Sequence, residues 1–231
     1  QVWDFVAKQR GNMEIQLRAL GAGADWDNLT FTLDNKVINR VYKTFKKMWD
    51  DGLIYRGERI VNYSTKYQTS YADIEVDYKE EKEKLWTISY PVLNSEGEIS
   101  EYLLVSTTRP ETMLGDTAVA VNPTDERYEK LIGRQVLVPL ANRTIPVIAD
   151  DHADPNYGTG VVKITPFHDP NDFEVGVRHK LPKIQVIGFD GKMTEAAGDY
   201  AGLEVMQARK NVLEDLKKQN LLYGEKDIIH T

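Results

Sequence analysis

The sequence predicts an α+β fold: a small mixed β-barrel with peripheral helices, preceded by a helical segment and a β ribbon. Three observations support this prediction. Residues 1–58 carry helical patterns, residues 59–84 contain short runs with a period of two, and residues 85–231 contain many short strand-like runs separated by helices. Because such alternation is typical of closed or nearly closed barrels with helical decoration, we expect residues 85–231 to form that domain.

The composition is that of a soluble globular protein, with 41% hydrophobic and 28% charged residues in 231. No apolar run approaches the ~20 residues of a membrane helix, so we expect no membrane partner. The absence of cysteine excludes disulfides, thiolate zinc sites and a thiol nucleophile. The chain starts at Gln1 without a signal or transit segment. We therefore expect a cytoplasmic fragment of a longer protein.

The net charge of −7 is unusual for a protein that binds nucleic acid by itself, since neutralising phosphates dominates such affinity. Two possibilities follow. Either the chain binds no nucleic acid, or it contacts a small part of one through a local basic patch while another domain supplies most of the affinity.

In the helical segment, residues 13–20 form a short amphipathic pattern that stops at Gly21. A clearer helix is predicted over 34–51, with Asp34 as N-cap and Gly52 following its end. Its apolar face consists of Val37, Val41, Phe45 and Met48, and we interpret that face as a packing surface.

The ribbon is predicted around residues 62–68, and the charged residues 80–84 are expected to break the strand pattern. The later runs predict strands over 85–93, 99–107, 117–121, 136–140, 145–149, 161–165 and 184–189. Helices are predicted over 125–131, 173–180 (after Asp172) and 203–221.

Two polar segments follow predicted strands. In residues 106–116, threonines, Arg109 and two carboxylates provide groups that bind anions or carbonyl oxygens. A structural alternative is a capping box formed by Thr108 and Glu111. In residues 158–172, Lys163 and Thr165 point to the same side of a strand. A lysine turned inward beside Asp169 and Asp172 indicates either an ion-pair network or a site for a polar ligand.

Other kinds of site fit less well. A metal site could use His152, His168, Asp169 and Asp172, but no tight ligand spacing such as H-x-x-x-H is present. A Ser-His-Asp hydrolase is disfavoured because no serine lies in a G-x-S-x-G elbow. We therefore expect no metal and no cofactor.

Residues 107–112 (TTRPET) and 163–172 (KITPFHDPND) resemble the two signature segments of the editing domain of valyl-tRNA synthetases. The resemblance continues over essentially the whole chain, including residues 52–57, 122–128 and 145–150 and the end near Ala208 and Arg209. It implies a β-barrel inserted into a class I catalytic domain. The ATP-binding HIGH and KMSKS signatures of that catalytic domain are absent, so ATP is expected only for the full-length enzyme.

The resemblance implies a hydrolase that removes threonine from mischarged tRNA(Val). Asp172 would bind the substrate ammonium group, and Lys163, Thr165 and Asp169 would surround the threonine hydroxyl or orient the attacking water. The terminal adenosine or its ester oxygens would be held by Thr107, Thr108, Arg109 and Thr112. His168 is either a general base or a buttress for its loop, and the buttress is the interpretation we prefer.

Departures from the family qualify these expectations. Ser64 and Tyr67 stand where the family commonly has cysteines, so any zinc in the ribbon should be lost. Phe167, which we place at the substrate pocket, replaces a residue that is usually smaller. For the 3′ end of the tRNA, the densest basic cluster near the site contains Arg178, His179, Lys180 and Lys183; a solvated helix end is the alternative.

Three other functions are weighed against this one. An isoleucyl-type editing domain would clear valine instead, and Lys163 and Asp169 argue against it. A non-catalytic tRNA-binding fragment has no chemical reason to keep the polar set described above. An unrelated metal hydrolase would lose activity on chelation.

Overall fold

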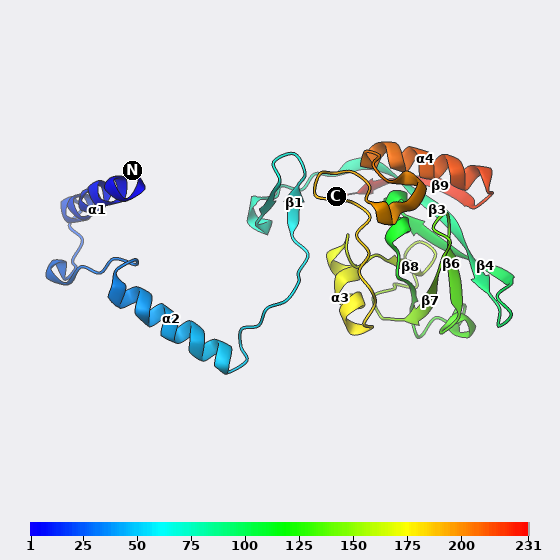
Figure 1. Cartoon of the computed structure of the whole chain (residues 1–231), viewed down its shortest axis with the longest axis horizontal. Helices are drawn as coiled ribbons and strands as arrows, with labels where there is room; N and C mark the ends of the chain where they lie inside the picture. Colours follow the sequence, from blue (N-terminus) through cyan, green and yellow to red (C-terminus); the bar gives the residue numbers. More distant parts are fainter. Residues whose placement is uncertain (231) are drawn as a thin grey trace. The chain divides into compact units, whose positions relative to one another are not determined.

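The structure is a computed structural model that describes residues 1–230. It separates into two compact units, residues 1–57 and residues 58–231 (Figure 1). The β ribbon therefore belongs to the same unit as the large sheet. The further division between ribbon and barrel, placed by sequence between residues 84 and 85, stays a prediction.

The first unit contains α1 (Val2–Ala19), a 3-10 helix η1 (Trp26–Asn28) and α2 (Asn35–Asp50). The prediction of α2 is confirmed, with Asp34 as N-cap and Gly52 at φ +73° after its end. The helix α1 is longer than expected and continues through Gly11. Neither helix has a buried residue, and Val41 and Phe45 are 56% and 53% exposed, so the apolar face of α2 is exposed in the described part of the chain and its role in packing stays a prediction.

The second unit is built on two sheets. The ribbon pairs two short antiparallel strands, β1 (Asn62–Ser64) and β2 (Thr69–Tyr71). The large sheet has the order β4-β3-β6-β7-β5-β8, with β9 paired to β3. Its strands are β3 (Glu81–Leu93), β4 (Ile99–Thr107), β5 (Ala118–Val121), β6 (Gln135–Val138), β7 (Arg143–Ala149), β8 (Val161–Ile164) and β9 (Leu222–His230).

The large sheet is mixed, because β5 and β7 are parallel while the other pairs are antiparallel. It curls into a half-barrel, with β4 and β8 as its two ends (Figure 1). The predicted α+β class is confirmed. The core is made by the inner faces of these strands together with the buried side of α4 (Val205–Lys218), which contributes Ala208, Val212 and Leu216.

The helix α3 (Pro170–Arg178) packs at one end of the half-barrel. Its Val175 joins a small cluster with Ala118, Ala120 and Ile164 of β5 and β8. Gly176 allows Pro166 to lie directly on this helix, since a Cβ at Gly176 would come 2.8 Å from Cγ of Pro166. The remaining 3-10 helices are η2 (Asp73–Glu75), η3 (Pro110–Gly115), η4 (Glu129–Leu131) and η5 (Glu195–Tyr200).

The expected charged break at residues 80–84 was wrong, because β3 begins at Glu81 and pairs there with β9. The strand β9 was not predicted, and its charged residues face the charged start of β3. Lys84 donates to Glu225 at 2.5 Å, for example. Opposite charges on neighbouring strands stabilise the pairing of β3 with β9, which the sequence of either strand alone does not indicate.

Two other predicted elements are absent from the described chain. Residues 125–131 form a turn and η4 instead of a helix, because Asp125 accepts hydrogen bonds from both the backbone and the side chain of Arg127. Residues 184–189 form no strand: Ile187 makes an isolated bridge with Met193, and residue 189 lies in a turn. Their N–H groups at positions 186 and 187 donate to His168 and not to a neighbouring strand. None of the helices in the described part is long and apolar enough to cross a membrane.

Candidate active site

A cavity of about 280 Å³ lies where the end of β4, the end of β8 and the start of α3 come together. It is lined by most of the residues that the two polar segments contributed to the prediction: Thr107, Thr108, Arg109, Thr112, Lys163, Thr165, His168, Asp169 and Asp172. Ser106, His152, Tyr157 and Asn171 also line it and were not predicted there. Segments far apart in the sequence thus form one polar cavity.

The threonine-rich turn after β4 holds its own shape. The hydroxyl of Thr107 accepts from the N–H of Arg109 at 3.0 Å, and the hydroxyl of Thr112 donates to the carbonyl oxygen of Arg109 at 2.9 Å. The guanidinium of Arg109 reaches across the cavity and donates to the carbonyl oxygen of His168 at 3.1 Å. Arg109 therefore joins the two polar segments.

Glu111 lies beneath this turn and is completely buried. The structural alternative, a capping box with Thr108, is not formed, because both oxygens of Glu111 accept from Arg209 of α4, at 2.7 and 2.9 Å. A buried carboxylate needs such a bidentate partner. The ion pair anchors the turn to α4, and the sequence alone did not indicate a role for Arg209.

Lys163 and Thr165 point to the same side, as the strand period predicts, and the ammonium group of Lys163 donates to the Thr165 hydroxyl. That hydroxyl in turn donates to Asp116 at 2.6 Å. Asp116 is completely buried behind the cavity and also accepts from the hydroxyl of Tyr90 at 2.7 Å. Its pKa is raised by burial, which the nearby Lys163 opposes from 3.5 Å.

Sequence reasoning missed Asp116 as a functional residue. It belongs to the polar segment 106–116, but only its position before the apolar strand β5 marked it. Arg143 fixes the surrounding backbone by donating to the carbonyl oxygens of Leu114 and Asp116. A carboxylate just before a fully buried strand is the signal that could have identified it.

The first turn of α3 supplies two carboxylates. The expected start of this helix at Asp172 was wrong by three residues: Asp169 is the N-cap, and its Oδ1 accepts from the N–H groups of Asn171 and Asp172 at 2.8 and 3.1 Å. Asp172 is buried, and its Oδ2 accepts from the N–H of Thr165 at 2.9 Å. Burial raises the pKa of Asp172 to about 6, although Lys163 opposes the shift.

His168 holds its loop against residues 186–187. Its Nε2 accepts from the N–H groups of Val186 and Ile187, at 3.0 and 3.3 Å, so this nitrogen carries no proton. Burial, together with the positive charges of Arg109 and Lys163, lowers the pKa of His168 to about 4. This geometry favours the buttress over the general base.

Phe167 lies apart from the cavity that it was expected to shape. It lines a second cavity, beside the ribbon, and its ring contacts that of His168 at a centroid distance of 5.5 Å. In the described part of the chain, no group of three or more histidines and carboxylates is arranged to hold a metal ion. His152 and Asp172 do approach each other, with Nε2 3.8 Å from Oδ1.

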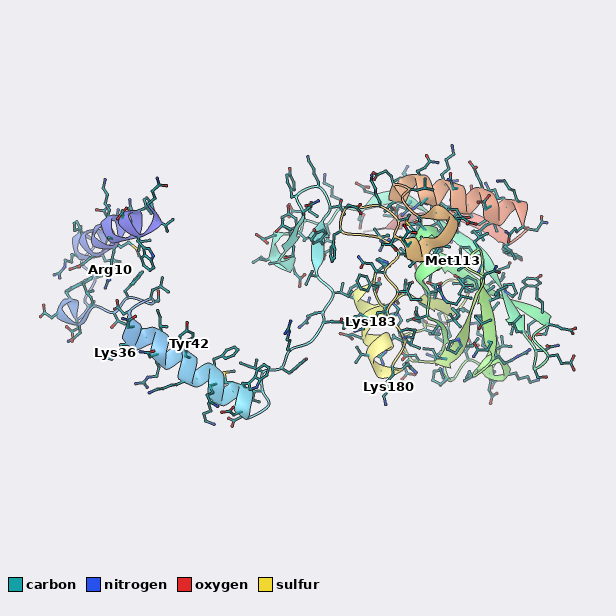
Figure 2. All side chains as sticks on the ribbon, viewed as in Figure 1. Arg10, Lys36, Tyr42, Met113, Lys180 and Lys183 are labelled. Atoms are coloured by element: carbon teal, nitrogen blue, oxygen red, sulfur yellow. The ribbon has the colours of Figure 1, made fainter. Side chains whose placement is uncertain are left out.

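The predicted basic cluster is divided between two carboxylates. Arg178 donates to buried Asp150 at 2.8 Å, and Nε2 of His179 lies 2.8 Å from the same carboxylate. Burial would raise the pKa of Asp150, but these partners outweigh it and the pKa lies at about 2. Lys183 donates to Glu58 at 2.6 Å, and Lys180 lies beyond the C-cap of α3 with a φ of +54° (Figure 2). Three of its four members are therefore paired with a carboxylate, and its contact with tRNA stays a prediction.

Comparison with known proteins connects this arrangement to a family. A family model described as tRNA synthetases class I (I, L, M and V) matches residues 1–222. The chain is 48% identical over 230 residues to the valine–tRNA ligase of Clostridium tetani, covering 100% of this chain and 26% of that protein. It is 50% identical over 231 residues to the valine–tRNA ligase of Carboxydothermus hydrogenoformans, again covering 100% and 26%.

Among solved structures, the chain is similar to one described as the crystal structure of GlLeuRS-CP1. The TM-score is 0.48 and the identity 17%, with 64% of this chain and 99% of that chain covered. The chain spans about a quarter of the length of the two valine–tRNA ligases described above.

Proposed function

The chain belongs to the class I tRNA synthetases, the family of the isoleucine, leucine, methionine and valine enzymes, and we propose that it is the editing domain of a valyl-tRNA synthetase. In this role it hydrolyses the ester of threonyl-tRNA(Val), and threonyl adenylate is a second potential substrate. Its partners are the 3′ end of that tRNA and the remainder of the synthetase. Synthesis of the ester belongs to that remainder.

The polarity of the cavity is the observation that carries this proposal. Valine and threonine have nearly the same shape, so an apolar pocket cannot strongly reject the added hydroxyl group. A second pocket can discriminate if its polar groups pair with that hydroxyl and are left unpaired by valine. The 280 Å³ cavity contains Lys163, Thr165, Asp169 and Asp172, which is the chemistry such a pocket requires.

The hydrogen bonds behind the cavity set the direction of its donors. The hydroxyl of Thr165 donates a hydrogen bond to Asp116, and the oxygen of the same hydroxyl therefore accepts from Lys163. Lys163 keeps further N–H groups that can donate to the threonine hydroxyl oxygen. Among the described residues, the hydrogen bonds to Asp169 go to its Oδ1, which leaves Oδ2 to accept the hydroxyl proton. Asp116 is thus a positioning residue.

Asp172 binds the ammonium group of the esterified amino acid. Its Oδ2 is held by the N–H of Thr165, and its Oδ1 lies on the side of His152. With a pKa of about 6, the carboxyl is ionised at neutral pH and forms a charge-assisted hydrogen bond to the ammonium group. This contact fixes the ester relative to the rest of the cavity.

Hydrolysis then requires a positioned water more than a strong nucleophile, because the ester is already activated. Lys163, Thr165 and Asp169 orient that water or the substrate hydroxyl, and Arg109, Thr107, Thr108 and Thr112 hold the terminal adenosine or the ester oxygens. His168 holds its loop against residues 186–187, and a water is the nucleophile in this scheme.

The test is deacylation of threonyl-tRNA(Val) beside valyl-tRNA(Val), with Asp172→Ala as the matched variant. Rapid loss of threonine alone, abolished by the substitution, supports the proposal. Clearance of valine from an isoleucine tRNA, with threonyl-tRNA(Val) left intact, would indicate an isoleucyl-type domain. Binding of tRNA without hydrolysis of any ester would indicate a non-catalytic fragment.

A further inference from the structure

His152 lies between the active-site cavity and a neighbouring cavity of about 320 Å³, and among the described residues it alone lines both. Asp150 and Arg178 are among the other residues around this side cavity. The sequence suggested His152 only as a metal ligand, and the chemistry proposed above gives its ring no role. The side chain is 30% exposed, so it is open to a ligand in the active-site cavity.

The backbone at His152 is fixed by Asp150, the residue that follows β7. The Oδ1 of Asp150 accepts from the N–H of His152 at 2.9 Å, which closes a turn of the kind that aspartate favours. The N–H of Asp150 donates to the carbonyl oxygen of Val121 in β5, at 3.0 Å. Arg178 of α3 donates to the same carboxylate at 2.8 Å. The elements that place Asp172 therefore also place His152.

The ring of His152 faces the carboxylate of Asp172. Its Nε2 lies 3.8 Å from Oδ1 of Asp172, which is beyond the length of a hydrogen bond, about 2.7–3.2 Å. The other oxygen, Oδ2, already accepts from the N–H of Thr165. In the part of the chain that the structure describes, neither ring nitrogen of His152 takes part in a hydrogen bond. Both groups therefore have acceptor capacity left at the cavity.

A single cation can use both acceptors. A carboxylate oxygen and the unprotonated nitrogen of a neutral imidazole both accept hydrogen bonds, whereas an ammonium group donates three. Two acceptors on one ammonium group stand roughly 4–5 Å apart when each bond is about 2.8 Å long. A small rotation of the partly exposed His152 ring reaches that separation from the observed 3.8 Å.

We propose that His152 and Asp172 together hold the ammonium group of the esterified amino acid. Oδ1 of Asp172 accepts one N–H, and Nε2 of a neutral His152, which carries its proton on Nδ1, accepts another. We call this pair the ammonium clamp. The inference rests on the proposed function, which places the ammonium group at Asp172. His152 is thus a further substrate-binding residue, and Asp150 is a positioning residue for it.

Direct binding tests the clamp independently of hydrolysis. The two probes are 3′-amino-3′-deoxyadenosine acylated with threonine or with 3-hydroxybutyrate, because an amide resists hydrolysis. The second acyl group keeps the carbon chain and the hydroxyl of threonine but lacks the ammonium group. Both are titrated into the full chain by calorimetry, and the second probe is the matched control for the first.

Two substitutions separate the acceptor from the ring. His152→Phe keeps a ring between the two cavities and removes the acceptor. It should weaken binding of the threonyl amide by about ten- to a hundredfold, the range for one hydrogen bond to a charged group, and leave the hydroxybutyryl amide unchanged. His152→Gln, whose amide oxygen can accept in place of Nε2, should retain most of the affinity for the threonyl amide.

The kinetic test uses threonyl-tRNA(Val). The clamp holds the ammonium group before and during the attack of water, so it contributes equally to the ground state and the transition state. His152→Phe should therefore raise KM by about ten- to a hundredfold and leave kcat within about twofold. A fall in kcat at constant KM would contradict the assignment of His152 to binding.

Other roles of His152 give different results, and each of them overturns the proposal. If the ring is only a wall between the cavities, His152→Phe binds the threonyl amide as tightly as the unaltered chain does. If the substitution only disturbs the turn, both amides weaken equally. If a protonated ring competes with the substrate for Asp172, His152→Phe binds the threonyl amide more tightly.

The proposed function is decided separately. When one of these results accompanies hydrolysis of threonyl-tRNA(Val) by the unaltered chain, the clamp is refuted and the proposed function stands. When the unaltered chain hydrolyses no ester, the proposed function fails, and the titrations still decide the clamp. Binding of neither amide by the unaltered chain would also refute the clamp.

Discussion

Replacing Asp172 with asparagine should make the chain more stable at neutral pH while abolishing hydrolysis. The reason is the buried position of its carboxyl group, which raises the pKa from 3.8 to about 6. The folded state therefore binds the proton more tightly than the unfolded state does. As a result, the free energy of unfolding falls as the pH rises from about 4 to about 6, and above that range the loss amounts to about 3 kcal/mol.

Asparagine has no charge to bury, so it avoids this loss of stability, and it keeps an oxygen that can accept from the N–H of Thr165. Asp172→Asn should therefore raise the free energy of unfolding at pH 7.5 by up to about 3 kcal/mol. That corresponds to a rise in Tm of about 6–12 °C for a unit of this size. At pH 4 most of the gain should vanish, because the folded carboxyl then holds its proton and the unfolded one, with a pKa of about 3.9, is close to half protonated.

The assay is urea unfolding at pH 4 and pH 7.5, followed by far-ultraviolet circular dichroism. Asp150→Asn is a control with the opposite expected sign. The pKa of Asp150 lies at about 2, below the ordinary 3.8, so the ionised carboxylate stabilises the folded state. That stability is lost as the pH falls through about 2. This substitution should cost about 2 kcal/mol at pH 7.5. An Asp172→Asn chain that is no more stable than the unaltered chain at pH 7.5, or equally more stable at both pH values, would refute the reasoning.

Three further predictions concern the same site. The kcat/KM for threonyl-tRNA should rise with pH through an apparent pKa of about 6, since Asp172 must be ionised and His168, at about 4, stays neutral; a limb centred elsewhere would contradict this assignment. Asp116→Asn, whose amide cannot accept from both hydroxyl donors, should lower kcat/KM by about five- to a hundredfold through an unpaired donor, and should also lower the preference for threonine over valine. Equal discrimination would argue that Asp116 is merely structural. Arg209→Met should destabilise the chain by about 3–5 kcal/mol because Glu111 is left buried and charged, and adding Glu111→Gln should recover most of it in a double-mutant cycle by urea unfolding.

Local sequence patterns predicted much of the fold. The apolar alternation of β4 and the amphipathic pattern of α2 predicted both elements closely, because the repeat of a strand or a helix sets which side chains share one face. The polar ends of β4 and β8 likewise marked the segments that line the cavity. The helix predicted over residues 125–131 was wrong because a side-chain interaction competes with the helical hydrogen bonds: Asp125 and Arg127 close a turn there.

What the sequence determined by itself is thus the α+β class, the main strands and the set of reactive side chains in two segments. Tertiary structure alone decided which distant groups meet. Asp116 accepts a hydrogen bond from Thr165 of the neighbouring chain segment, Arg209 of α4 pairs with Glu111, and β9 pairs with the charged start of β3. The physical reason is that a buried charge or an exposed strand edge is stabilised by whichever partner the chain brings to it, and that partner leaves no periodic trace at either position.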